Sequence, residues 1–215
     1  MKRSIVALVS LVCMSCSSSS MGPKPINSSA IVPPDKSIFN YTFQNTDPSV
    51  LLTEQVTIKD VSSSEFVASL LSDTLANFST TSTDSFAVLT NGDLLGLSSS
   101  DTLPISSHKT FSEIPISIPV KLNGEEGTGT IRTGIFYIGQ ETIFTANENF
   151  TCDKVKVVDT VNMVYPSQPS MNSTYIYALI YWYSIKLGYF VKAQVIESDT
   201  NDLWTRILTS YTLGH

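Results

Sequence analysis

Few side chains in this sequence could act as acids, bases or nucleophiles at neutral pH. The chain of 215 residues has two histidines, His108 in a polar segment and His215 at the last position, and histidine is the side chain that normally titrates near neutrality. A serine–histidine–aspartate site assembled in space stays open, because serine is abundant. The segment nearest to a nucleophile elbow, residues 96–100, lacks the closing glycine. We therefore assign no catalytic residue, and a small secreted hydrolase with a loop-assembled site stays the alternative hypothesis.

Candidates for metal or cofactor chemistry are equally few. Three cysteines and two histidines offer no spacing typical of zinc, haem or iron–sulfur sites. Residues 199–202 bring carboxylate and amide oxygens together as calcium loops do, but they lack the glycine and the distal glutamate of such a loop, so we expect a solvated turn. Cys152 lies in an expected strand and should be buried as a small apolar side chain. We predict no metal site and no cofactor.

The amino-terminal residues have the form of a secretory signal. Lys2 and Arg3 precede an apolar segment of about eleven residues, 4–14, which is shorter than the roughly 20 residues of a spanning helix. The Ser15-Cys16 pair that follows resembles the bacterial lipoprotein signal, in which the cysteine is diacylated and becomes the first residue. The resemblance implies a signal peptide over residues 1–15 and lipidation of Cys16. A plain signal peptide cleaved nearby is the open alternative.

The rest of the chain is expected to divide into a linker and one domain. Residues 16–36 are rich in serine and proline and have no periodic apolar pattern, as is typical of an extended tether. Residues 37–215 form a single β-rich domain.

The net charge of −6 argues against a nucleic-acid partner. With Cys16 acylated, the predicted location is the outer membrane, facing the periplasm or the cell surface. A soluble periplasmic or extracellular protein is the alternative.

The composition and the residue pattern of the domain predict a mainly β fold. Hydrophobic residues make up 42% of the chain and charged residues 15%, a low charged share that excludes coiled coils and helical solenoids. Apolar and polar residues alternate along most of the domain, which indicates half-buried strands. Asn91-Gly92 is a strong hairpin signal, and Pro115 and Pro119 indicate an edge strand. Later strands are expected at about 129–138, 141–147, 152–164, 174–184, 188–197 and 203–213.

One segment has a helical pattern instead. Ser62 and Glu65 have the spacing of a capping box, and the apolar residues that follow fall at helical spacing. The pattern predicts one amphipathic helix at about 63–78. The expected fold class is therefore mainly β (α+β), a curved antiparallel meander or half-barrel with this helix packed on it.

The carboxy-terminal part contains four short motifs. They are Gly139–Thr142, Phe150 with Lys154-Val155, Tyr181-Trp182-Tyr183, and Gly188 with Val191-Lys192. With these motifs it resembles a broad group of uncharacterised bacterial envelope proteins, which share a Gly-x-Glu-Thr strand start, an aromatic residue leading to Lys-Val, a Tyr-Trp-Tyr strand, and a glycine before Val-Lys. The resemblance implies a strongly curved antiparallel sheet in periplasmic or lipid-anchored proteins, and it implies no catalytic residues.

A tyrosine-rich strand face is the candidate binding site. Alternation puts Tyr175, Tyr177, Tyr181 and Tyr183 on one side of the strand at 174–184, and tyrosine combines an apolar ring with a polar tip. These rings either pack beneath the expected helix or floor an open concave surface. We predict a lipid-anchored, non-catalytic binding or structural module, with the membrane as one partner. An apolar ligand or another envelope protein is the candidate second partner.

Overall fold

The computed structural model describes residues 30–45, 51–73, 79–97, 101–112, 115–198 and 203–214. Within these ranges the protein is one antiparallel sheet of 13 strands, in the order β6-β5-β4-β3-β2-β1-β13-β12-β11-β10-β9-β7, with β8 paired to β9. A single 3-10 turn, η1 (Pro169–Met171), links β10 to β11. The strands are β1 (Ile38–Asn45), β2 (Leu51–Lys59), β3 (Glu65–Asp73), β4 (Ser79–Val88), β5 (Leu94–Gly96), β6 (Thr102–Leu103), β7 (Phe111–Ser112), β8 (Ile116–Leu122), β9 (Glu125–Thr145), β10 (Glu148–Val164), β11 (Ser173–Ser184), β12 (Tyr189–Ser198) and β13 (Trp204–Thr212).

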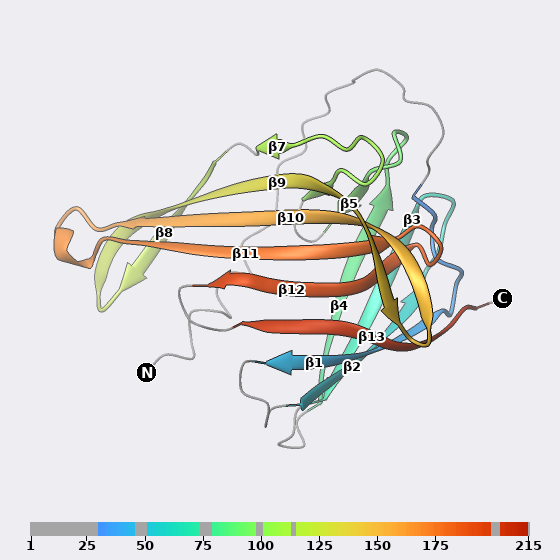
Figure 1. Ribbon diagram of the computed structural model, residues 1–215. Helices are drawn as coiled ribbons and strands as arrows, with labels where there is room; N and C mark the ends of the chain where they lie inside the picture. Colours follow the sequence, from blue (N-terminus) through green and yellow to red (C-terminus); the bar gives the residue numbers. More distant parts are fainter. Residues whose placement is uncertain are drawn as a thin grey trace.

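The sheet folds over on itself without closing. Figure 1 shows β3 and β4 behind the plane of β9 to β13, while β9, β10 and β11 extend to the left, where they are accompanied by β8 alone. At the other end the hairpin of β9 and β10 bends toward β13, where the Thr145 hydroxyl donates a hydrogen bond to the Leu208 carbonyl. The curved antiparallel sheet that we predicted is therefore present.

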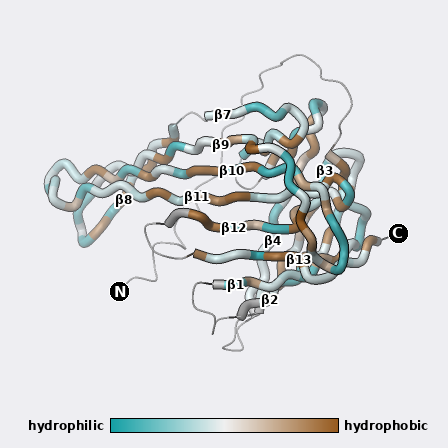
Figure 2. The backbone as a smooth tube through the Cα atoms, in the orientation of Figure 1, coloured by the Kyte–Doolittle hydropathy of each residue, from teal (hydrophilic) through white to brown (hydrophobic). Residues whose placement is uncertain are grey.

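The core lies between the two layers of the folded sheet. Side chains that alternate along each strand point into it, as Phe39 and Tyr41 of β1 and Val155 and Val157 of β10 do, all of them buried. Figure 2 shows the corresponding alternation of hydrophobic and hydrophilic segments along β10, β11 and β12. The stretch 175–191 forms β11, a tight turn and the start of β12, and in the described part of the chain no helix is long and apolar enough to cross a membrane.

The predicted helix at about 63–78 is wrong. Residues 65–73 form β3, which pairs with β2 on one side and β4 on the other, and residues 74–78 lie outside the described ranges. The Ser62 hydroxyl does accept a hydrogen bond from the Glu65 amide at 3.0 Å, but the Ser62 amide also donates to the Glu65 carbonyl. The serine therefore closes a turn before a strand. Ladders with β2 and β4 pair the backbone of β3 on both sides. A helix there would pair its own backbone but would leave the facing edges of β2 and β4 without a partner.

Three smaller predictions about strands had different outcomes. β8, which contains Pro119, pairs with β9 alone, so the predicted edge strand is confirmed. The Asn91-Gly92 hairpin between β4 and β5 is confirmed as well, with Gly92 at φ 81°. The predicted break at 139–140 is wrong, because β9 runs continuously through Gly139. There the register against β10 shifts by one residue, as in a β-bulge.

Candidate functional site

A cavity of about 250 Å³ lies between the two layers of the folded sheet. We call it the interior cavity. One wall comes from β4, β5 and β6 and the other from β10 to β13, so strands far apart in the sheet order meet around it. Its lining residues are Asp84, Ser85, Phe86, Gly96, Asp101, Leu103, Val157, Tyr181, Tyr189, Phe190, Ala193, Trp204 and Arg206.

Aromatic rings form most of the apolar surface of the interior cavity. Phe190 stands between Tyr181 and Tyr189, with ring centroids 5.2 Å away in both cases. Phe86 from the opposite wall meets Tyr189 edge-on at 6.0 Å. Burial raises the pKa of the Tyr189 hydroxyl to about 12 and that of Tyr181 also well above its ordinary value. Both hydroxyls therefore stay protonated and neutral at physiological pH.

A buried ion pair sets the charge at the base of the cavity. Arg206 of β13 contacts Glu54 of β2 at 2.6 Å, and only 11% and 7% of these side chains are exposed. The Arg206 guanidinium also lies 3.9 Å from the ring centroid of Tyr41, whose hydroxyl donates to the Phe190 carbonyl at 2.6 Å. Ser72 donates a weaker hydrogen bond to the other Glu54 oxygen at 3.3 Å. The charge of Arg206 is thus compensated within the protein.

Two further carboxyl groups line the same cavity. Asp84 comes from β4 and Asp101 from the segment before β6. Burial raises the pKa of Asp84 above its ordinary value of 3.8, and the positive charge of Arg206 opposes that shift. Since Glu54 already balances Arg206, Asp84 adds negative charge to the cavity once it is ionised.

The predicted tyrosine face is only partly at this cavity. Tyr181 lines it, whereas Tyr183 is fully buried in the core and its hydroxyl donates to the Ile31 carbonyl at 3.3 Å. Tyr175 and Tyr177, farther along β11, are half-buried and do not line the cavity. Because the helix expected to cover these rings is absent, strands β4 to β6 form the opposite wall instead.

His108 does not have the geometry of a general base. Its ring is stacked on Tyr137 with centroids 4.1 Å apart, and 46% of its side chain is exposed. The nearest carboxylate oxygen, on Asp153, lies 3.8 Å from Nε2, which is longer than a hydrogen bond. Asp153 instead accepts hydrogen bonds from the Tyr137 hydroxyl and the Gln140 amide.

The remaining candidates from the sequence also have defined positions. Cys152 is a free, buried cysteine, as predicted, and burial with the nearby Asp153 and Glu141 charges raises the pKa of its thiol to about 12. Such a thiol has no activated thiolate. Among the described residues no cluster of histidine, cysteine, aspartate and glutamate could hold a metal ion. Cys16 and residues 199–202 lie outside the described residues.

Sequence reasoning missed the charged members of the site. Arg206 stands between Trp204 and Leu208 in the alternation of β13, and Asp84 stands two residues before Phe86 in β4. A charged residue on the apolar side of a strand signals a buried polar site. That signal was available in the sequence, but the partner residues lie on β2, β4 and β11 and only the fold brings them together.

Comparison with known proteins gives a likeness of fold. No known family model matches the sequence, and no curated protein sequence is similar to it. The crystal structure of a candidate lipoprotein from Parabacteroides distasonis matches with a TM-score of 0.50 at 13% identity, covering 87% of this chain and 100% of that one.

Two further structures are similar at a lower level. A candidate exported protein with a YmcC-like fold from Bacteroides fragilis matches with a TM-score of 0.47 at 14% identity, over 84% of this chain and 97% of that one. The hypothetical lipoprotein YmcC from Escherichia coli matches with a TM-score of 0.39 at 11% identity, over 81% and 84%. The predicted resemblance to β-rich bacterial envelope proteins is thus confirmed, and the chain shares the fold of the Parabacteroides distasonis protein.

Proposed function

We propose that this protein is a lipid-anchored envelope protein that binds a small organic cation, without catalysis, in the interior cavity. The observation that carries the proposal is the meeting of five aromatic side chains with the carboxyl group of Asp84 around one cavity. A cation over an aromatic face is attracted by the ring quadrupole, most strongly when water is excluded. The carboxylate of Asp84 supplies the opposite charge.

The size of the cavity limits the ligand to a small molecule. Its volume of about 250 Å³ is below the range of roughly 300–1,000 Å³ typical of drug-sized ligands. The aromatic lining requires an apolar body next to the charge, as in an alkylammonium group. An inorganic cation would gain little from these rings and would want more oxygen ligands than the cavity walls supply.

The hydrolase alternative has less support. A hydrolase needs a base oriented by a second group and close to a nucleophile. His108 is half exposed, and its nearest carboxylate is 3.8 Å away. It is not among the residues that line the interior cavity. A binding role therefore accounts for more of the arrangement than catalysis does.

Choline should bind to the purified protein, and its uncharged isostere, in which a carbon replaces the nitrogen, should not. Binding is followed by calorimetry and by tryptophan fluorescence, to which Trp204 of the cavity wall contributes. Affinity should rise with pH through the raised pKa of Asp84, because the carboxyl group attracts a cation only after it loses its proton. Asp84→Asn should weaken binding about tenfold, ~1.4 kcal/mol, and should remove that part of the pH dependence.

Asp159→Asn is the matched control. Burial raises the pKa of Asp159 as it does that of Asp84, but Asp159 accepts a hydrogen bond from Thr133 and does not line the cavity. This variant should bind choline as the wild type does. Equal binding of choline and its isostere, or equal weakening in both variants, would contradict the proposed ligand class.

The lipid anchor is tested separately. Cells grown with an alkyne analogue of palmitate should incorporate the label into the wild-type protein and not into Cys16→Ala, since the thiol is the acyl acceptor of the proposed signal. Cys152→Ala should be labelled like the wild type, because Cys152 is buried. Label retained by Cys16→Ala, or absent from all three proteins, would favour the plain signal peptide.

A further inference from the structure

The outer side of β9 and β10 carries a second, shallow hollow of about 430 Å³. We call it the outer hollow. Arg132, Gly134, Phe136 and Ile138 follow one another at alternate positions of β9, and Lys156 and Val158 do so on β10. Strand alternation puts them on the side opposite to Ile135, Val155 and Val157, which point into the core. The outer hollow is therefore separate from the interior cavity.

Apolar side chains are exposed in the outer hollow. Phe136 is 38% and Ile138 52% exposed. The Phe136 ring lies against Gly134, where an added Cβ would come within 2.9 Å of the ring. The missing side chain at Gly134 thus makes room for the ring, so the depression and the exposed aromatic belong to one arrangement. Exposed apolar groups gathered in one place mark contact surfaces more often than scattered ones do.

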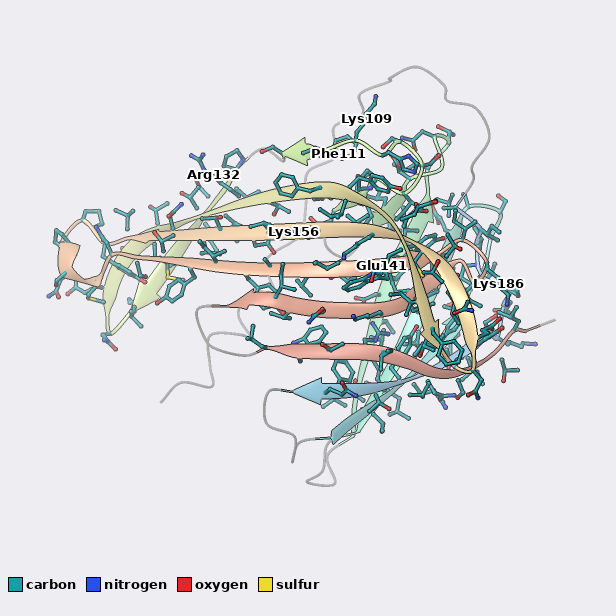
Figure 3. All side chains as sticks on the ribbon, viewed as in Figure 1. Lys109, Phe111, Arg132, Glu141, Lys156 and Lys186 are labelled. Carbon is teal, nitrogen blue, oxygen red and sulfur yellow. The ribbon has the colours of Figure 1, made fainter. Side chains whose placement is uncertain are left out.

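The charges around these apolar groups are all positive. Lys156 is the ladder partner of Phe136, and Arg132 lies farther along β9. Figure 3 shows both cations on the long strands, with Phe111 on the short strand β7 nearby. None of the ion pairs within the described ranges involves Arg132 or Lys156, and no carboxylate lines the outer hollow. This is unusual in a chain with a net charge of −6.

The next row of side chains on the same face is basic too. Lys154 and Lys192 lie 5.0 and 4.3 Å from the ring centroid of Trp182. Glu141 compensates one of them, through its contact with Lys154 at 2.8 Å. The face as a whole therefore combines cations with aromatic rings and aliphatic side chains.

We propose that the outer hollow docks on the headgroup region of an anionic membrane. Lysine and arginine near such a surface are attracted to its negative potential, while an apolar patch surrounded by basic residues can enter the boundary between headgroups and acyl chains. The phosphate of an acidic phospholipid would pair with the cations of Arg132 and Lys156. The acyl chains beneath the headgroups would supply the apolar layer for Phe136 and Ile138. The docking does not depend on a ligand in the interior cavity.

The test places an environment-sensitive fluorophore at Ile138→Cys in the full-length protein. With vesicles containing phosphatidylglycerol, its emission should shift to the blue, and high salt should reverse the shift because salt screens surface charge. With phosphatidylcholine alone no shift is expected. A fluorophore at Phe144→Cys, on the same strand, 69% exposed and outside the hollow, should not respond to either vesicle. Unmodified protein treated with the fluorophore gives the background from native cysteines.

Charge variants test whether the emission shift depends on the two cations of the outer hollow. Arg132→Glu/Lys156→Glu should abolish the shift, whereas Lys59→Glu/Lys121→Glu changes the net charge equally at exposed sites elsewhere and should leave it intact. An unchanged emission at residue 138, an equal shift on phosphatidylcholine, or an equal loss in both charge variants would overturn the proposal. A shift produced by polyglutamate without vesicles would identify an acidic protein as the partner instead and would also overturn it.

Discussion

Replacing Glu54 by alanine should lower the free energy of unfolding by about 3–5 kcal/mol, the usual effect of removing one member of a buried ion pair. Arg206 would then lie in the core with 11% of its side chain exposed and no carboxylate at 2.6 Å. Urea unfolding monitored by fluorescence gives the change directly.

Two further variants show whether the cause is the unpaired charge. Glu54→Met/Arg206→Met removes both charges and keeps similar volume, so it should be much more stable than Glu54→Ala. Glu126→Ala breaks the pair with Lys121 at the exposed β8–β9 turn, where the side chains are 86% and 65% exposed, and should change stability by less than about 1 kcal/mol. Equal losses in Glu54→Ala and Glu126→Ala would mean that burial does not strengthen the Glu54–Arg206 pair.

Alternation along the chain was enough to predict most strands and the antiparallel character of the sheet. The helix failed because one segment satisfies two periods. Phe66, Ala68 and Leu70 alternate as a strand requires, while Phe66, Val67, Leu70 and Leu71 fall at helical spacing. The ladders with β2 and β4 decide between them, and pairing with a neighbouring strand is a tertiary contact that the apolar period of one segment does not reveal.

The candidate site could be predicted only in part for the same reason. Alternation put Tyr181 and Tyr183 on one side of their strand, which is the core side. It could not tell that Tyr181 would face a cavity while Tyr183 would be packed against the carbonyl of Ile31. That difference depends on which segment covers each ring, and the covering segments come from β4 to β6 and from residues before β1.

Those residues before β1 pack on the sheet. Ala30 is buried, and the turn between β11 and β12 lies against Ile31 and Pro33. This contact bears on the predicted tether over residues 16–36, since residues 30–33 would belong to the folded unit if the contact contributes to stability. Gly188 lies at the point of closest approach and offers a way to measure that contribution.

Gly188→Ala should destabilise the protein by about 3 kcal/mol or more, the sum of backbone strain and steric overlap. Gly188 has φ 67°, a region that residues with a Cβ rarely adopt, and its added Cβ would lie 2.2 Å from the Ile31 carbonyl oxygen. The alanine can be accommodated only by moving residues 30–33, which also breaks the hydrogen bond from Tyr183 to Ile31. The change is read from urea unfolding curves.

Gly124→Ala separates the two causes. Gly124 has φ 89° in the turn between β8 and β9, but an added Cβ there meets no atom within 4 Å. This variant should therefore show the backbone strain alone, about 1 kcal/mol. The difference between the two variants measures the contact between the β11–β12 turn and residues 30–33. If the two alanines cost the same, residues 30–33 do not contribute to the stability of the fold, and the tether extends to residue 36 as the sequence predicts.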